Sequence, residues 1–250
     1  MANDARNDAG QEKHEESVFE DRKYIELIYS EERRPQTDYP ARLAAHLRDA
    51  WYGGTGTLLD IGCGRGDMLK ALFDAGFTVA GVDLSPVSAE TCKPHPVRIA
   101  DLEKDELPYP TASFEYVFSK SVIEHLRNPM PFLNEAHRVL TPGGTAVIMT
   151  PSWMHNNWGP FYIDFTHVTP FTAPSLRDAM HMAGFSQVRV IHFHQLPFLW
   201  KKPWLVPIIR LLALLPFRYR PMYDINLPPK LNTLFRFSKE VMLLAVGNKS

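Results

Sequence analysis

Blocks of apolar residues alternate with helical patterns along most of this chain, and the first block is the most informative. Its apolar run over 57–61 stops at a glycine cluster over 62–66, and a helical pattern over 67–75 starts directly afterwards. This order predicts a buried strand, a tight turn and a helix N-terminus, the unit at which many α/β sheets hold a ligand. Glycines in the turn allow positive φ angles and let backbone N–H groups approach that ligand closely.

The same alternation continues towards the end of the chain. Gly76 ends the first helix, Pro129 opens another at its first position, and Thr172 opens a third. Strands are expected within 77–84, 97–100, 114–126, 138–150, 186–194 and 241–246, and further helices over 129–140 and 173–183. Strands and helices that alternate with short links predict an α/β fold with a doubly wound, seven-stranded sheet. We expect residues 53–194 and 239–250 to form this domain.

The residues before the first strand divide into a polar part and a helical part. Residues 1–17 are polar and lack the apolar core of a signal peptide, so we expect a disordered tail. Residues 18–52 are expected to form N-terminal cap helices, because Leu43, Leu47 and Trp51 recur on one helical face.

Charge and cysteine content narrow the class of protein. The net charge is −1 over 250 residues, so no basic field favours nucleic acid as a partner. The chain has two cysteines, and Cys63 lies inside the glycine turn, so a structural disulfide with Cys92 is not expected. A reducing, cytoplasmic location is favoured.

Three acidic residues lie at the ends of predicted strands. Asp60 directly precedes the glycine turn, where a carboxylate would repel a pyrophosphate but suits an ammonium or sulfonium ligand. Asp83 ends the second strand, where an acid accepts the hydroxyls of an adenosine ribose. Asp101 follows the third strand, well placed for an adenine amino group. The turn also departs from the dinucleotide fingerprint, because Asp67 replaces its third glycine.

Together these segments resemble the class I S-adenosylmethionine-dependent methyltransferases, specifically the branch that acts on quinones, sugars and other small molecules. The resemblance covers roughly 55–192 and the last strand at 241–246. It implies S-adenosylmethionine as cofactor and S-adenosylhomocysteine as product. The cofactor-binding residues that it implies are Asp60, Gly62, Cys63, Gly64, Asp83, Leu84, Asp101, Leu102 and Ser119.

Other interpretations of the same residues remain open. The glycine turn can be a purely structural connection, and Asp83 can be a helix N-cap. A nicotinamide dehydrogenase also carries an acid after its second strand, although Asp60 and the missing third glycine argue against this class.

The candidate catalytic residues are His125, after the fourth strand, and His167, after the fifth. The resemblance implies that such a histidine acts as the base towards an acceptor hydroxyl, and Glu124 and Asp164 are placed to orient the two imidazoles. Either histidine can instead have a structural role. No metal site is expected, because the acids near these histidines lack the clustered spacing of one.

The expected function is methylation of a sugar hydroxyl in a surface glycan, lipid-linked saccharide or glycosylated metabolite. Aromatic residues that crowd the loop after the fifth strand can line an acceptor pocket or only pack; they are Trp153, Trp158, Phe161 and Tyr162. A prenylated quinone or another apolar molecule is the alternative acceptor. From a different class, the chain can be a non-catalytic cofactor-binding partner subunit.

A hydrophobic and basic insertion is expected over 195–238, before the last strand. No Asp or Glu occurs over 179–223, whereas Arg210 and several other basic residues do. The apolar stretch over 204–215 is too short to span a bilayer, which takes about 20 residues. The insertion is therefore expected to contact an anionic membrane peripherally, at the inner face, or to form a homodimer contact.

Overall fold

The computed structural model describes residues 36–250. The expected tail over 1–17 and the first part of the expected cap helices, 18–35, lie outside the described residues. The described elements, in chain order, are α2 (Tyr39–Leu47), η1 (Arg48–Tyr52), β1 (Thr57–Ile61), α3 (Asp67–Asp74), β2 (Thr78–Asp83), α4 (Pro86–Thr91), β3 (Val97–Ile99), β4 (Phe114–Lys120), η2 (Ile123–His125), α5 (Met130–Val139), β5 (Leu140–Pro151), α6 (Trp153–Asn156), η3 (Pro160–Ile163), α7 (Ala173–Met182), β6 (Ser186–His194), α8 (Pro197–Lys201), η4 (Pro203–Leu205), α9 (Val206–Leu214), α10 (Pro229–Lys239) and β7 (Val241–Asn248).

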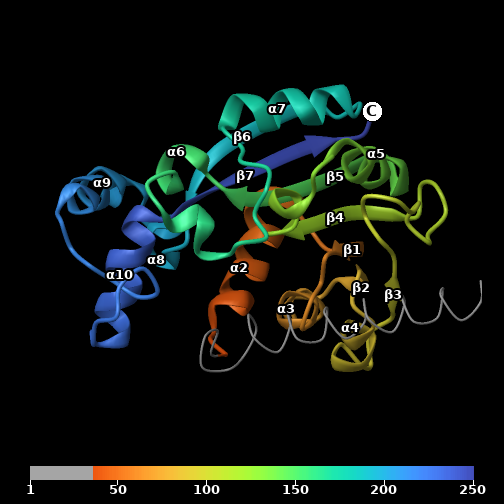
Figure 1. The fold of residues 1–250 in the computed structure, drawn as a ribbon. Helices are drawn as coiled ribbons and strands as arrows, with labels where there is room; N and C mark the ends of the chain where they lie inside the picture. Colours follow the sequence, from red (N-terminus) through yellow and green to blue (C-terminus); the bar gives the residue numbers. More distant parts are fainter. Residues whose placement is uncertain (1–35) are drawn as a thin grey trace, which may run out of the picture.

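Seven strands form one sheet in the order β3-β2-β1-β4-β5-β7-β6. The first five strands are parallel, and β7 runs antiparallel between β5 and β6 (Figure 1). The order reverses at β1 and β4, and an open α/β sheet holds its ligands at the carboxyl ends of the strands near such a reversal. The expected doubly wound, seven-stranded α/β sheet is confirmed.

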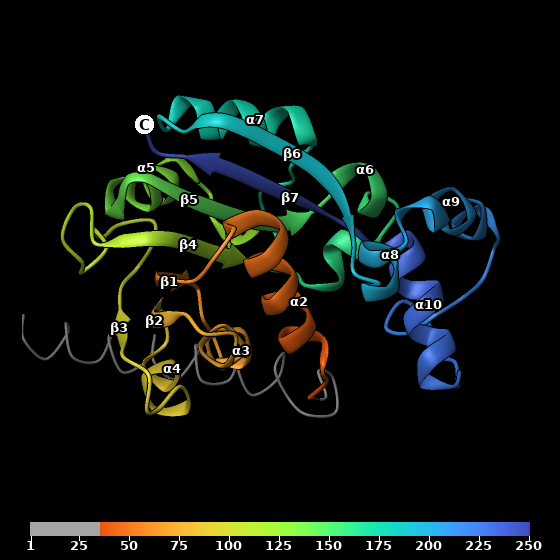
Figure 2. The ribbon, with the colours of Figure 1, turned by 180° about the vertical axis from the view of Figure 1, so that it is seen from behind.

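Helices cover both faces of the sheet. Helices α5 and α7 lie on one face, and α2 and α3 lie on the other (Figures 1 and 2). Leu133 of α5 and Leu176 of α7 belong to one buried cluster, whereas Leu43 of α2 and Leu72 of α3 belong to a second. The central strands read as continuous apolar runs because they are buried from both sides.

Local residue choices explain where several elements begin and end. Gly66 adopts φ +87° directly before α3, and Gly53 adopts φ +72° after η1. A side chain at either position would meet the strain of the left-handed region. Thr172 and Ser175 form a reciprocal capping box at the start of α7.

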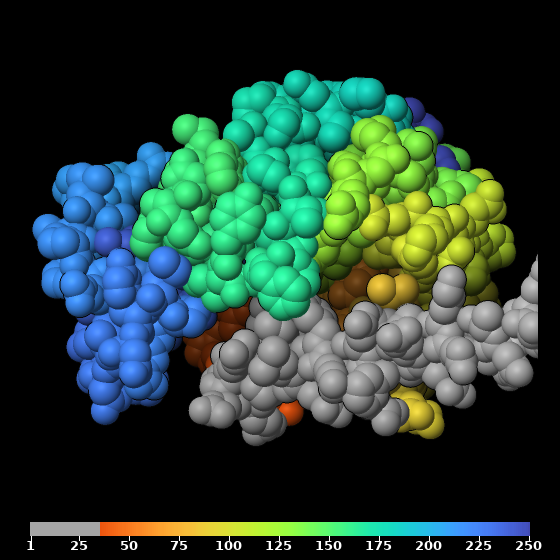
Figure 3. Space-filling model, in the orientation of Figure 1, coloured from red at the N-terminus to blue at the C-terminus, as the bar shows by residue number. Residues whose placement is uncertain are grey.

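The segment between β6 and β7 folds as four short helical pieces. Pro197, Pro203, Pro207 and Pro229 each stand in the first turn of one piece, where proline is compatible with a helix but limits its upstream extension. Leu199 and Ile209 are buried in a small apolar cluster of their own, separate from the two main ones. This segment forms the blue lobe beside the loop after β5 (Figure 3).

Candidate active site

The acidic and glycine positions singled out from the sequence gather at one edge of the sheet. Asp60 lies in β1, one residue before its end, and Asp83 is the last residue of β2. Asp101 follows β3 by two residues, and Ser119 is the penultimate residue of β4. These four strands are parallel neighbours, so their carboxyl ends point to the same side. The topology thus brings together positions that come from four separate segments.

The glycine turn is held tightly against its neighbours. The Gly62 N–H donates to the Val82 carbonyl at 2.7 Å, and the Gly64 N–H donates to Oδ2 of Asp83 at 2.7 Å. Gly62 adopts φ +77°, and a Cβ built there would lie 2.2 Å from Cγ2 of Val122. Glycine is therefore required both for the backbone conformation and for this close approach.

Asp83 is half-buried and accepts hydrogen bonds from two backbone N–H groups, those of Gly64 and Ser85. A carboxylate has about four acceptor sites, so capacity for two ligand hydroxyls remains. The N-cap of α4 is Ser85, whose hydroxyl accepts from the Val87 N–H. The alternative in which Asp83 caps this helix is therefore wrong. Leu84, next to Asp83, is 49% exposed.

Asp60 is buried, and its Oδ2 has no hydrogen-bond partner among residues 36–250. Burial raises the pKa of Asp60 well above its ordinary value, and the charges of Cys92 and Asp83 raise it further. A buried acceptor without a partner is costly, and a positive ligand charge nearby would favour the ionised form. The site thus fits a cationic ligand better than a pyrophosphate.

The other expected cofactor positions differ in how much side chain they present. Asp101 pairs with Lys104 at 2.6 Å and also accepts from the Glu103 N–H. Ser119 is buried, and its hydroxyl donates to the Ile61 carbonyl at 2.9 Å, which ties β4 to β1. The side chains of Cys63 and Leu102 are buried as well, so these positions offer mainly backbone groups.

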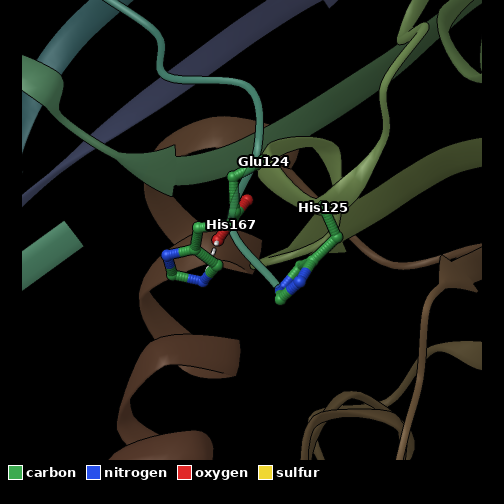
Figure 4. Close-up of side chains that lie close together, drawn as sticks. All are labelled: Glu124, His125 and His167. Atoms are coloured by element: carbon green, nitrogen blue, oxygen red, sulfur yellow. Dashed lines mark ion pairs between the residues drawn. The ribbon is translucent and has the colours of Figure 1, made fainter. Parts of the chain in front are cut away.

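A second group of side chains follows β4, next to the glycine turn. Val122, which the turn touches, directly precedes η2, and η2 carries Glu124 and His125. The loop after β5 folds back onto η2 because the Glu124 carbonyl accepts from the N–H groups of Val168 and Thr169. This contact brings His167 beside the other two residues (Figure 4).

Hydrogen bonds set the tautomer of both imidazoles. Nδ1 of His167 lies 2.6 Å from the Phe161 carbonyl oxygen, which can only accept. Nδ1 of His125 lies 2.8 Å from Oγ1 of Thr166, and that hydroxyl donates its one hydrogen to Asp164 at 2.6 Å. Both Nδ1 atoms are therefore donors, and Nε2 carries the lone pair in each neutral ring.

Glu124 is fully buried and has two differently placed oxygens. Its Oε2 accepts from the Thr150 hydroxyl at 2.9 Å. Its Oε1 has no hydrogen-bond partner in the described part of the chain and lies 3.9 Å from Nε2 of His167. Burial raises the pKa of Glu124 to about 7. The carboxyl group is thus held between a hydroxyl on β5 and an imidazole from the loop.

The sequence did not reveal that Thr166 connects Asp164 to His125. The signal was available, since Asp164, Thr166 and His167 lie within four consecutive positions. Of the loop aromatics, Phe161 is buried and packs against the His167 ring with centroids 4.9 Å apart. Tyr162 and Trp158 are 58% and 46% exposed, so only part of this aromatic cluster is available to a ligand.

Chemically, this edge combines two capabilities. Half-buried carboxylates and glycine N–H groups on one side suit a nucleoside with ribose hydroxyls and a positive charge. Two imidazoles with Nε2 lone pairs on the other side suit proton removal or metal binding.

Comparison with known proteins identifies the family of this chain. A family model described as a methyltransferase domain matches residues 29–190. The chain is 31% identical over 109 residues to a demethylmenaquinone methyltransferase of Tropheryma whipplei, covering 42% of this chain and 46% of that protein. It is 38% identical over 103 residues to a tRNA U34 carboxymethyltransferase of Shewanella denitrificans, covering 38% and 31%.

The fold comparison extends over most of the chain. A solved SAM-dependent methyltransferase from Archaeoglobus fulgidus superposes with a TM-score of 0.59 at 19% identity, covering 89% of this chain and 99% of that one. The chain belongs to the class I S-adenosylmethionine-dependent methyltransferases, which excludes the nicotinamide alternative. It spans less than half the length of the two curated relatives. Within residues 36–250, no helix combines the length and apolar character needed to cross a membrane.

Proposed function

We propose that this chain transfers the methyl group of S-adenosylmethionine to a hydroxyl oxygen of a saccharide, free or linked to a lipid. The observation that carries the proposal is the imidazole pair of His125 and His167, with both Nε2 lone pairs set by their Nδ1 hydrogen bonds. His125 belongs to η2, which directly follows Val122, the residue whose side chain contacts the glycine turn. A basic nitrogen beside the cofactor is what methylation of an alcohol requires.

On the cofactor side, we assign Asp83 to the ribose hydroxyls and Asp101 to the adenine amino group. Gly62 and Gly64 would present backbone to the cofactor, and Asp60 would face its positive charge from within β1. The unpartnered Oδ2 of Asp60 supports this assignment. Leu84 offers an exposed apolar surface beside Asp83, whereas Cys63, Leu102 and Ser119 would act through backbone or by shaping the turn.

When bound, the sulfonium supplies an electrophilic methyl carbon. The chain positions the acceptor oxygen in line with that carbon and takes away its proton. Nε2 of His125 is assigned as the base, because the hydrogen-bonded series from Asp164 through Thr166 fixes its tautomer and orients the ring. His167, held by the Phe161 carbonyl and facing Glu124, is assigned to orient the hydroxyl.

Exposed aromatic rings in the loop that carries His167 support a saccharide as the acceptor. Tyr162 and Phe165 are 58% and 77% exposed, and both belong to the loop that delivers His167. Aromatic side chains pair an apolar face with nearby polar groups, which suits a ring that carries hydroxyls on an apolar skeleton.

A prenylated quinone is the second candidate acceptor. One relative is named a demethylmenaquinone methyltransferase, and the lobe between β6 and β7 exposes apolar side chains. A phenolic hydroxyl is more acidic than an alcohol, so this reaction would depend less on His125.

We further propose that η4 and α9 contact an anionic membrane surface. Trp204, Ile208, Leu211 and Leu214 are between 55% and 80% exposed, whereas Ile209 on the opposite face is buried. Arg210 and Lys239 line a cavity of about 370 Å³ whose wall includes Leu214. Exposed apolar residues next to basic groups match a bilayer that carries negative headgroups.

An acceptor screen tests the proposed reaction. The protein is incubated with methyl-labelled S-adenosylmethionine and one of three acceptors: a lipid-linked saccharide, a prenylated catechol or tRNA. We expect label in the saccharide fraction together with release of S-adenosylhomocysteine. Label only in the catechol would select the second candidate, and label in tRNA would overturn the small-molecule assignment. Binding of S-adenosylhomocysteine without transfer to any acceptor would favour a non-catalytic subunit.

Vesicle flotation tests the proposed membrane contact. Wild type should float with anionic vesicles and not with neutral ones, and Ile208→Asp should abolish flotation. Met182→Asp is the matched control, because Met182 is an exposed apolar residue on α7, away from the lobe. If Ile208→Asp instead splits a dimer and wild type ignores both lipids, the surface belongs to a second copy of the chain.

A further inference from the structure

We propose that Glu124, His125 and His167 bind one divalent transition-metal ion, of the kind that Zn²⁺ represents, at the acceptor end of the site. Each residue offers one ligand atom, and the three atoms all lie within 4.8 Å of one another. Figure 4 shows the carboxylate above the His167 ring, with the His125 ring beside them. The sequence predicted no metal here, because it does not reveal that the loop after β5 folds back onto η2.

The donor set determines which ions fit. Two imidazole nitrogens and one carboxylate oxygen favour Zn²⁺, Co²⁺, Fe²⁺ or Mn²⁺ over Ca²⁺, which prefers a shell of oxygens. Three protein ligands also leave at least one coordination position for a water or a substrate oxygen, the arrangement of catalytic rather than structural metal sites.

Both imidazoles carry the outer hydrogen bonds that metal-bound histidines have. A metal-ligating histidine usually donates its second ring N–H to a backbone carbonyl or a carboxylate. His167 donates to the Phe161 carbonyl, and His125 donates to Thr166, which donates in turn to the Asp164 carboxylate. Because Nδ1 of each ring is a donor, Nε2 of each ring carries the lone pair and can act as a metal ligand.

Glu124 supplies the strongest geometric argument. Its Oε1 is buried without a hydrogen-bond partner among the described residues, and such groups are rare unless an ion or water completes them. The distance of 3.9 Å to Nε2 of His167 is too long for a hydrogen bond. Two metal bonds of about 2.0–2.2 Å each hold their ligand atoms roughly 3–4 Å apart, which matches this separation.

The surrounding contacts hold the three ligands in place. The Thr150 hydroxyl fixes the other oxygen of Glu124 at 2.9 Å. The Glu124 carbonyl accepts from the N–H groups of Val168 and Thr169, which ties the loop that carries His167 to η2. A site whose ligands are oriented before the ion arrives binds it with less conformational cost.

The role of the ion rests on the proposed function, whereas its binding does not. An ion at this position would bind the acceptor oxygen and lower the pKa of its hydroxyl. The hydroxyl proton then passes to solvent water, the oxygen–carbon bond forms, and the sulfur–carbon bond of the cofactor breaks. With the ion bound, His125 activates the acceptor hydroxyl through the ion, and without the ion the same Nε2 takes the proton directly.

A titration on the full chain tests the site without any acceptor. Chelator-treated protein is titrated with Zn²⁺ by calorimetry and with Co²⁺ by visible absorption. We expect one ion per chain and a cobalt spectrum of low symmetry with nitrogen ligands. Glu124→Gln, His125→Ala and His167→Ala should each weaken binding at least tenfold. Thr166→Val should weaken it by about 10–100-fold, since it removes only an outer hydrogen bond.

His192→Ala is the matched control, because His192 also pairs with a second histidine, His155, at a ring-centroid distance of 4.8 Å. This variant should bind the ion as wild type does, and all variants should keep their affinity for S-adenosylhomocysteine. The inference is overturned if wild type binds no ion, if the three ligand variants bind equally well, or if His192→Ala abolishes binding. Methyl transfer that persists unchanged in chelator would overturn the ion's role and leave the proposed function intact. Stoichiometric binding with no transfer to any acceptor would overturn the proposed function, and with it the ion's role, but would leave the metal site intact.

Discussion

The two sides of the glycine turn are built in different ways. On the cofactor side, Asp60, Asp83 and Asp101 each lie within two residues of the end of their own strand, and the parallel sheet aligns them. On the acceptor side, His125 and His167 come from segments far apart in the chain and meet because a loop folds back. The cofactor side is therefore a property of strand order, whereas the acceptor side is a property of one loop.

The two sides also differ in how they treat charge. Asp83 and Asp101 keep part of their carboxylates accessible and satisfy them with backbone N–H groups or Lys104. Glu124 is fully buried, and burial raises its pKa to about 7. Affinity for the cofactor should accordingly depend on the first side and turnover on the second, which makes the two sides separable by mutation.

The largest expected effect lies on the acceptor side. His125→Ala should lower kcat by roughly 10²–10⁴, because it removes the proposed base or metal ligand. Its affinity for S-adenosylhomocysteine should stay near that of wild type, as measured by calorimetry. A variant that loses cofactor affinity as strongly as turnover would show that the two sides are not separable.

The turn that joins the two sides should be the next most sensitive position. Gly62→Ala combines the strain of φ +77° with a clash against Val122, about 2–4 kcal/mol in total. We expect a lower melting temperature together with weaker binding of S-adenosylhomocysteine.

Gly53→Ala provides the matched control for that experiment. Gly53 adopts φ +72°, but a Cβ there would meet no atom within 4 Å among the described residues. The Gly53→Ala variant should lower the melting temperature through backbone strain alone and should leave the affinity for S-adenosylhomocysteine unchanged. Equal effects in both variants would mean that contact with Val122 is unimportant.

On the cofactor side, Asp83→Ala should weaken binding of S-adenosylhomocysteine by about 1–3 kcal/mol, the usual effect of losing a charged hydrogen-bond partner. Part of this loss would come from the glycine turn, because the substitution also removes the hydrogen bond that the Gly64 N–H donates to Asp83. Asp74→Ala, which breaks an exposed ion pair on α3, should leave the affinity unchanged in calorimetry. An unchanged affinity in Asp83→Ala would remove this residue from the cofactor site.

The smallest effect concerns a histidine outside both sides. Burial, together with the neighbouring charges of His192, His194 and Arg210, lowers the pKa of His155 to about 4. Between about pH 6.5 and pH 4 the unfolded chain therefore binds a proton that the folded protein excludes. The free energy of unfolding should fall as the pH falls through this range, and His155→Gln should reduce the slope. Denaturant titrations at several pH values would measure it, and a slope equal to wild type would contradict the assignment.

Sequence and structure agree most closely where the pattern is local. The strands β2, β3 and β6 lie within one residue of their expected bounds, and α7 ends one residue before its expected end. Alternation of buried strands with capped helices is set by near neighbours in the chain, which is why it can be read directly. The insertion was less predictable, because its apolar side chains are not all buried. Ile209 is buried, whereas its neighbour Ile208 is exposed.

The sequence by itself determined the sheet, the glycine turn and the acids that follow the strands, because each depends on a short stretch whose geometry follows from residue type. Only the tertiary structure decided that Glu124 faces His167, that Thr166 connects His125 to Asp164, and that the three donor atoms converge. The physical reason is that this convergence depends on two backbone hydrogen bonds to the Glu124 carbonyl, formed by a loop that lies far away in the chain. Such contacts leave no periodic pattern in the residues that make them.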